Sequence, residues 1–162
     1  DAIHGHFILS KYVCLAPSIR TAAFFRTPVD RVLSQYQFHQ RRPLVGHPLS
    51  HAIHIDQLPV DRFICLPQMV HFYRTFLGGW SPDQLDFVGL TEAYEDSLAL
   101  FERMFQLRLP RYNLNVNEKP DYEAQIFECG GRKEIERLHA ENLRLYDLAR
   151  MRFDELLKQY PG

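Results

Sequence analysis

A short apolar run followed at once by a helix-forming segment constrains the fold more than any other feature of this sequence. The run is Thr21 to Phe25 (TAAFF), and its length and composition predict a buried strand that ends at Arg26. The next apolar residues recur at i, i+3, i+4 and i+7, which predicts one buried face of a helix: Val29, Val32, Leu33 and Tyr36. The helix start is signalled by Thr27 as N-cap, Pro28 at the first helical position and Asp30 as a capping-box-like acid.

A second unit of the same kind follows later in the chain. Leu85 to Leu90 (LDFVGL) predicts another strand, and Thr91 is expected to cap the helix after it. Apolar residues that share one face of this helix are Tyr94, Leu98, Phe101 and Phe105. Alternating strands and helices favour an α/β fold in which helices flank a parallel sheet.

The C-terminal segment predicts one long helix from about Arg132 to Tyr160. Its expected buried stripe consists of Leu138, Leu145, Tyr146, Ala149, Phe153 and Leu157. Before it, residues 110–131 are polar and broken, which favours a loop. Arg41 to Arg62 is rich in proline and histidine without a clear period, and it predicts a long surface excursion.

Composition limits the classes of function. The chain has 162 residues, 46% hydrophobic and 24% charged, which predicts one globular domain spanning residues 1–162. The net charge of −1 gives no overall basic field for nucleic acid or a membrane surface, so any anion site must be local. No apolar stretch approaches the roughly 20 residues of a membrane span, and no signal peptide is visible.

Cysteines and histidines are the residues whose spacing could indicate a metal site. Cys14, Cys65 and Cys129 are scattered without a CxxC pair, which argues against a disulfide framework or structural zinc. Three histidines, His47, His51 and His54, have the i, i+4, i+7 spacing of metal ligands on a helix. Pro48 and the lack of a nearby carboxylate cluster instead favour solvated loop histidines, so no metal is expected.

Arg26 occupies a position where α/β proteins bind ligands. It follows the first strand directly, at the carboxyl end that borders the ligand crevice. Thr27, Arg31 and Ser34 share one helix face, so Arg26 and the Ser34 hydroxyl are candidates to bind a phosphate near the positive end of the helix. The same spacing also fits an Arg26 paired with a neighbouring carboxylate and a Ser34 that is merely solvated.

Two histidines near the start of the chain are candidates for acid–base chemistry. The segment Ile3 to Phe7 reads IHGHF, and Gly5 would let a ligand approach the imidazoles of His4 and His6 closely. A neutral histidine there is a candidate general base. A tag remnant, a fortuitous pair or a metal contact would give the same pattern.

Taken in order, these segments resemble the carbohydrate sulfotransferases, particularly the group that contains heparan sulfate 2-O-sulfotransferase. The most specific element is the pattern R-x-P-x-x-R-x-x-S-x-Y, met by Arg26, Pro28, Arg31, Ser34 and Tyr36. HGH is similar to the family's catalytic histidine segment, and FVGLTEAYEDSLALF to its next strand and helix. The resemblance covers nearly the whole chain.

The resemblance implies a P-loop-kinase-like fold and transfer of a sulfuryl group from 3′-phosphoadenosine 5′-phosphosulfate (PAPS) to a hydroxyl of a carbohydrate or other hydroxylated acceptor. Adenosine 3′,5′-bisphosphate (PAP) would be the nucleotide product. By this resemblance Arg26 and Ser34 hold the 3′-phosphate, His6 is the general base, and His4 supports it. Three further cofactor contacts are expected where the family closes over the nucleotide, at Lys119, Arg132 and Lys133.

One departure from the family is clear. No Gly-Lys-Thr/Ser or similar loop occurs in the 162 residues, although the family has its first strand and a lysine-bearing P-loop before the HGH segment. The chain is therefore expected to be the larger C-terminal part of a domain, lacking the first strand and the P-loop and inactive alone.

The rival reading is a non-catalytic nucleotide- or glycan-binding module on the same scaffold. A kinase-like phosphotransferase would need a Walker-type loop and magnesium-binding acids, which the sequence does not offer. The scattered cysteines and lack of an anchor favour the cytoplasm of a bacterium, whereas an animal member would lie in the Golgi lumen.

Overall fold

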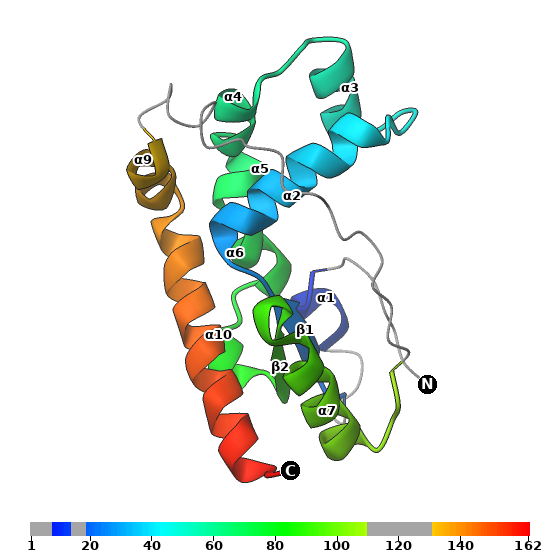
Figure 1. Cartoon of the computed structure of the whole chain (residues 1–162), viewed down its shortest axis with the longest axis vertical. Coiled ribbons are helices and arrows are strands. Elements are labelled where there is room, and N and C mark those ends of the chain that lie inside the picture. Colours follow the sequence, from blue (N-terminus) through cyan, green and yellow to red (C-terminus); the bar gives the residue numbers. More distant parts are fainter. Residues whose placement is uncertain (1–7, 14–18, 110–130) are drawn as a thin grey trace.

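The computed structural model describes residues 8–13, 19–109 and 131–162. Figure 1 shows a mainly helical molecule in which one long C-terminal helix runs along one side. The elements are α1 (Ser10–Val13), β1 (Ala22–Phe25), α2 (Pro28–Arg41), α3 (Pro48–His54), α4 (Val60–Ile64), α5 (Pro67–Val70), α6 (Phe72–Leu77), the 3-10 helices η1 (Pro82–Gln84) and η2 (Thr91–Ala93), β2 (Phe87–Leu90), α7 (Tyr94–Phe105), α9 (Gly131–Leu138) and α10 (Ala140–Gln159).

The two predicted strands form a parallel pair. β1 and β2 align so that Ala22 pairs with Phe87 and Phe25 with Leu90, and the sheet has these two strands within the described residues. The α/β prediction is therefore confirmed at this coarse level, although helices dominate the chain. The more specific P-loop-kinase-like arrangement stays a prediction.

Polar contacts at the start of the strands fix their register. The Asp86 carboxylate accepts hydrogen bonds from the Thr21 backbone N–H at 2.7 Å and from its hydroxyl at 3.1 Å. Halfway along the pair, Phe24 lies opposite Gly89, where a Cβ would come within 2.6 Å of the Phe24 ring. Glycine is needed at position 89 because the ring occupies the place of a side chain.

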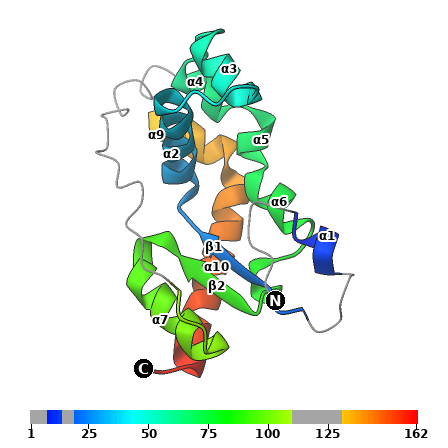
Figure 2. The same cartoon turned by 90° about the vertical axis from the view of Figure 1, so that its right-hand side faces the viewer.

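Two apolar clusters hold the molecule together. The first surrounds the sheet, where α7 and α10 pack against β2 and all four residues of β2 are buried. The second joins α2, α3, α4 and α5 to α9 around the fully buried Phe63. Figure 2 shows these two regions at opposite ends of the molecule, with β1 leading from the sheet directly into α2.

The segment from Arg41 to Arg62, predicted as a long surface excursion without a clear period, is partly helical. That segment contains α3 and the first residues of α4. Pro48, which favoured a loop, occupies the first turn of α3, where its missing N–H has no intrahelical partner to lose. His47 caps this helix, because its Nδ1 accepts the Leu49 backbone N–H at 3.3 Å.

Two helix starts also differ from expectation in detail. Thr27 precedes α2 as predicted, but its hydroxyl donates to Asp30 at 2.7 Å instead of accepting a backbone N–H. Thr91 begins the 3-10 turn η2, so α7 starts only at Tyr94. The Ser97 hydroxyl bonds both the N–H and the carbonyl of Leu90, and so ties α7 to the end of β2.

The predicted C-terminal helix is present in two pieces separated by His139. Hydrogen bonds continue on both sides of this residue, from His139 N–H to the Ile135 carbonyl and from Leu143 N–H to the His139 carbonyl. Within the predicted stripe, Leu145, Tyr146, Ala149 and Phe153 are buried, and Leu138 and Leu157 are half-buried.

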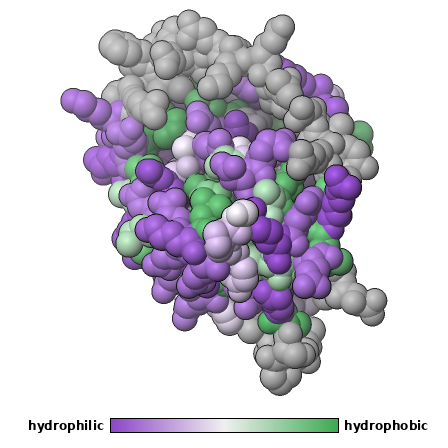
Figure 3. Space-filling model, turned by 60° about the horizontal axis from the view of Figure 1, so that its bottom comes forward, coloured by the Kyte–Doolittle hydropathy of each residue, from purple (hydrophilic) through white to green (hydrophobic). Residues whose placement is uncertain are grey.

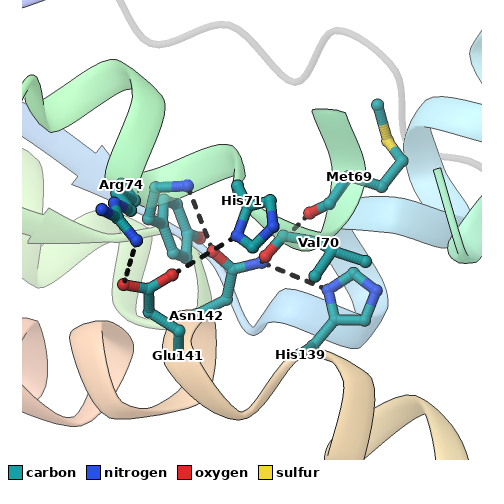
Figure 4. A network of polar contacts seen from close by, with 8 residues as sticks. Met69, Val70, His71, Arg74, His139, Glu141 and Asn142 are labelled. Atoms are coloured by element: carbon teal, nitrogen blue, oxygen red, sulfur yellow. Dashed lines mark hydrogen bonds and ion pairs between the residues drawn. The ribbon is translucent and has the colours of Figure 1, made fainter. Parts of the chain in front are cut away.

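A buried polar network joins the start of α10 to α5 and α6 (Figure 4). The Asn142 side-chain oxygen accepts the Tyr73 N–H at 3.2 Å, and its amide nitrogen donates to the carbonyls of Met69 and Val70 at 3.0 and 2.9 Å. His139 lies beside it, with Nδ1 3.2 Å from the Asn142 nitrogen. Asn142 therefore satisfies backbone groups at the α5–α6 junction that would otherwise be buried without partners.

The surroundings of His139 determine its protonation. Its Nε2 lies 2.9 Å from the Ile64 carbonyl, which only accepts, so Nε2 carries the hydrogen and Nδ1 is the acceptor facing Asn142. Burial lowers the pKa of His139, although the Ile64 carbonyl opposes this change. The side chain is fully buried and stays a neutral part of the core.

Hydrophilic residues cover most of the described surface on the side where α10 ends, with a small apolar area among them (Figure 3). Among the described helices, none is both long and apolar enough to cross a membrane.

Candidate functional site

A pocket of about 630 Å³ lies along one side of α2. It is bounded by the end of β1, by α6 and by the loop that connects α2 to α3. The lining residues are Arg26, Arg31, Ser34, Gln35, Phe38, His39, Arg41, Arg42, Leu44, His47, Phe72 and Phe76. Four of them are arginines and none is an aspartate or glutamate, so the described lining has a strong local positive charge in a chain of net charge −1.

The backbone at Arg26 is held firmly where β1 leads into α2. The Arg26 N–H donates to the Tyr73 hydroxyl oxygen at 3.0 Å, and that hydroxyl donates to the Arg26 carbonyl. Burial raises the pKa of Tyr73 to about 12, so the phenol remains a donor. The next N–H, of Thr27, is already bound by the Glu92 carboxylate at 2.7 Å, so the pocket relies on side chains more than on the helix end.

Arg26 and Ser34 line the same pocket, as their spacing suggested. The alternative in which Arg26 pairs with a carboxylate has no support in the described part of the chain, where neither Arg26 nor Arg31 forms an ion pair. The Ser34 side chain is half-buried. A guanidinium and a hydroxyl are thus directed to one pocket without a carboxylate to neutralise the charge.

Arg31 is the most unusual charge of the site. Its guanidinium lies over the Phe72 ring, and both terminal nitrogens are 3.1 Å from the Gln35 side-chain oxygen. Its Nε is buried and has no hydrogen-bond partner among the described residues. Burial lowers the pKa of Arg31 to about 9, which still leaves it charged at neutral pH. A buried cation without an anionic partner is costly, and an anionic ligand would remove that cost.

The far end of the pocket was missed by sequence reasoning. It comprises Arg41 and Arg42 at the end of α2, together with His39, Leu44 and His47. A signal was available, because no aspartate or glutamate occurs between Arg31 and Ile55. Such an acid-free stretch in a chain with balanced charges indicates a local anion site.

The histidines of α3 do not form a metal site. His54 Nε2 donates to the His39 carbonyl at 2.8 Å, His51 pairs with Asp56 at 3.4 Å, and His47 caps the helix. His51 and His54 are exposed, as expected of solvated histidines, but they lie on α3 and not in a loop, and His47 directly precedes that helix. Within the described ranges, no group of three metal-ligating side chains comes together.

The remaining predicted site residues are not among the described residues that line this pocket. His4, His6 and Lys119 lie outside the described residues. Arg132 falls in the first turn of α9, and its side chain is outside what the structure describes. Lys133 is exposed on α9 and is not part of the pocket lining, so its contact with a nucleotide stays a prediction.

Comparison of the chain with protein-family models, with curated proteins and with solved structures found no match. Guanidinium groups and a hydroxyl around one hollow can bind phosphate or sulfate through charge-assisted hydrogen bonds, and the adjoining aromatic rings can contact an apolar or planar part of the same ligand.

Proposed function

We propose that the pocket beside α2 binds the 3′-phosphate of PAPS and that the chain is part of a PAPS-dependent sulfotransferase. The observation that carries the proposal is Arg31, a half-buried cation whose buried Nε lacks a partner among the described residues, beside Arg26 and Ser34 in a pocket whose described lining has no carboxylate. An isolated buried charge is stabilised when an opposite charge binds next to it.

The size of the pocket supports a nucleotide over a simple inorganic anion. About 630 Å³ lies within the range of sites that enclose drug-sized ligands, and a phosphate group alone would fill a small part of it. Phe72 and Phe76 add apolar surface beside the arginines. In this proposal Arg26 binds two phosphate oxygens as a fork, Ser34 donates one more hydrogen bond, and Arg31 supplies a third charged contact.

Bound PAPS would supply the activated sulfuryl group, while this chain's residues position the nucleotide and accept a proton. His6 is proposed to remove the proton of the acceptor hydroxyl, with His4 supporting its orientation, as the resemblance to carbohydrate sulfotransferases implies. Holding the 3′-phosphate far from the reacting atoms uses remote binding energy to orient the sulfuryl group. The acceptor remains a hydroxylated compound, with a carbohydrate as the first candidate.

Calorimetric titration with PAP and with adenosine 5′-monophosphate tests this proposal. The two ligands share the nucleoside and the 5′-phosphate, so we expect PAP to bind much more tightly because only PAP has the 3′-phosphate. Arg26→Ala is expected to weaken PAP binding by about 2 kcal/mol, roughly 30-fold, while it leaves the weaker ligand nearly unaffected.

Arg103→Ala is the matched control, since Arg103 is an exposed arginine of α7 outside the pocket. The affinity of the Arg103→Ala variant for PAP should equal that of the unmodified protein. Equal affinities of the unmodified protein for the two nucleotides, or equal losses in both arginine variants, would contradict a 3′-phosphate site at Arg26.

A further inference from the structure

One imidazole in the wall of the pocket has no role in the proposed function. His39 is 3% exposed, yet it lines the pocket, and its ring lies 4.4 Å from that of His47, which lines the pocket as well. From its other side His39 is held by α3: its Nδ1 is 2.9 Å from the Ser50 hydroxyl, and its carbonyl accepts from His54. The ring is thus fixed at the border between the pocket and the α2–α3 contact.

The reason for the His54 contact is local. The carbonyl of His39 would normally accept a hydrogen bond from the residue four positions later, but that residue is Pro43, which has no N–H. His54 replaces the missing donor, and because a carbonyl only accepts, Nε2 of His54 carries the hydrogen. These contacts leave His39 in a defined position and account for its burial without any ligand.

We propose that His39 couples anion binding in this pocket to the uptake of one proton. The inference rests on the proposed function in one respect, that the pocket binds the phosphate of the nucleotide. It adds that His39 takes up a proton when the anion enters, so the positive charge of the protein groups around the anion increases. Anion binding therefore becomes tighter as the pH falls.

The charges around His39 explain the coupling. Arginines line the pocket beside it, namely Arg26, Arg31, Arg41 and Arg42, and the imidazoles of His47 and His54 approach from α3 and the loop before it. Asp56, just after α3, pairs with His51. The apolar rings of Phe72 and Phe76 face the pocket from α6. Without an anion, an added proton on His39 would face a described lining that has four arginines and no aspartate or glutamate.

Burial, followed by the neighbouring His47 and His54, lowers the pKa of His39. A bound anion makes the local field at His39 less positive, so it raises the proton affinity of the ring, and by linkage the proton raises the affinity for the anion equally. The effect is absent well above the ordinary histidine pKa of about 6.5, and it grows as the pH falls below that value.

His39 is better suited than His47 to take up this proton. Ser50 can donate to a neutral Nδ1 or accept from a protonated one, so His39 keeps its hydrogen bond in both states. His47, in contrast, uses Nδ1 to accept the Leu49 N–H, and a proton on that atom would break the cap of α3. Of the two neighbouring histidines, His39 can therefore gain a proton without losing its hydrogen bond to Ser50, whereas His47 cannot keep its bond to the Leu49 N–H.

The test uses inorganic sulfate, because its charge does not change over the relevant pH range, whereas a phosphate would titrate itself. Nuclear magnetic resonance of the whole chain follows the His39 ring protons during a pH titration with and without saturating sulfate. We expect His39 to bind its proton about tenfold more tightly with sulfate present, and sulfate to bind up to about tenfold more tightly at pH of about 5.5 than at about 7.5.

Three asparagine variants assign the effect. His39→Asn should lose the pH dependence of sulfate affinity, whereas His47→Asn, which keeps a side-chain acceptor for the α3 cap, and His51→Asn, outside the pocket, should retain it. If His39→Asn does not fold, the titration of His39 in the unmodified protein still decides the question.

The two proposals fail in different ways. Sulfate binding that needs Arg26 but leaves the His39 titration unchanged would overturn the proton coupling and leave the proposed nucleotide site intact. Absence of both sulfate and PAP binding would overturn the proposed function, and the coupling with it.

Discussion

Arg31→Met is expected to abolish most of the affinity for PAP while the folded protein becomes more stable. Methionine has a similar length, fills the space against Phe72 and needs no hydrogen bonds, whereas Arg31 leaves a buried Nε without a partner among the described residues. Replacing such a buried charge by an apolar side chain is commonly neutral or stabilising, here by about 1 kcal/mol. Loss of the charged contact should weaken PAP binding by about 2 to 3 kcal/mol, roughly 30- to 150-fold.

Urea unfolding and PAP calorimetry on the same variant measure both effects. The combination of unchanged or higher stability with weaker PAP binding is diagnostic. The protein would lose stability if a structural arginine were replaced, but not if the residue served ligand binding alone. Arg103→Met, on the exposed face of α7, is the matched control and should change neither quantity appreciably. A large loss of stability in Arg31→Met with unchanged PAP affinity would show that Arg31 serves the fold alone.

Asn142→Ala is expected to cause the largest loss of stability, about 3 kcal/mol or more. The side chain is 2% exposed and bonds the Tyr73 N–H and the carbonyls of Met69 and Val70, besides its contact with His139. Alanine would leave these groups buried without partners, and each such group costs about 1 to 3 kcal/mol before any relaxation.

Denaturant unfolding gives the size of this effect, with Arg144→Ala as the control. Arg144 is exposed on the same helix, so its replacement should stay within about 0.5 kcal/mol of the unmodified protein. An Asn142→Ala variant as stable as the control would mean that water or a local rearrangement satisfies the α5–α6 junction, and that the network does not hold the two helices together.

The strand–turn–helix units were predictable because their signals are local. Apolar runs of strand length at Thr21–Phe25 and Leu85–Leu90 mark β1 and β2, and Pro28 marks the start of α2. Neither the parallel register nor the need for Gly89 could be predicted, since both depend on residues more than 60 positions apart that meet only in the folded chain.

The short helices were not predictable by the same reasoning. α3 has seven residues, so it completes about two turns and offers too few positions for a helical period to emerge. No glycine or proline marks the point where α9 ends and α10 begins. It occurs at His139, which is fully buried and bonded to Ile64 and Asn142, so long-range contacts determine it.

A small part of the candidate site could be predicted from spacing. Arg26 and Ser34 follow from the position of the strand end and from helical geometry, and they do line one pocket. Arg41 and Arg42 lie at the far end of α2, and their approach to the same hollow depends on how the loop after Pro43 turns back along the helix. Phe72 contributes from α6, a helix that the sequence analysis did not predict.

A crystal structure of the chain with PAP tests the central claim most directly. The 3′-phosphate is expected beside α2, with its oxygens within hydrogen-bond distance of the Arg26 guanidinium and the Ser34 hydroxyl and with Arg31 Nε bonded to it directly or through a water. PAP bound elsewhere, or bound beside α2 with its 3′-phosphate away from Arg26 and Ser34, would contradict the proposed site.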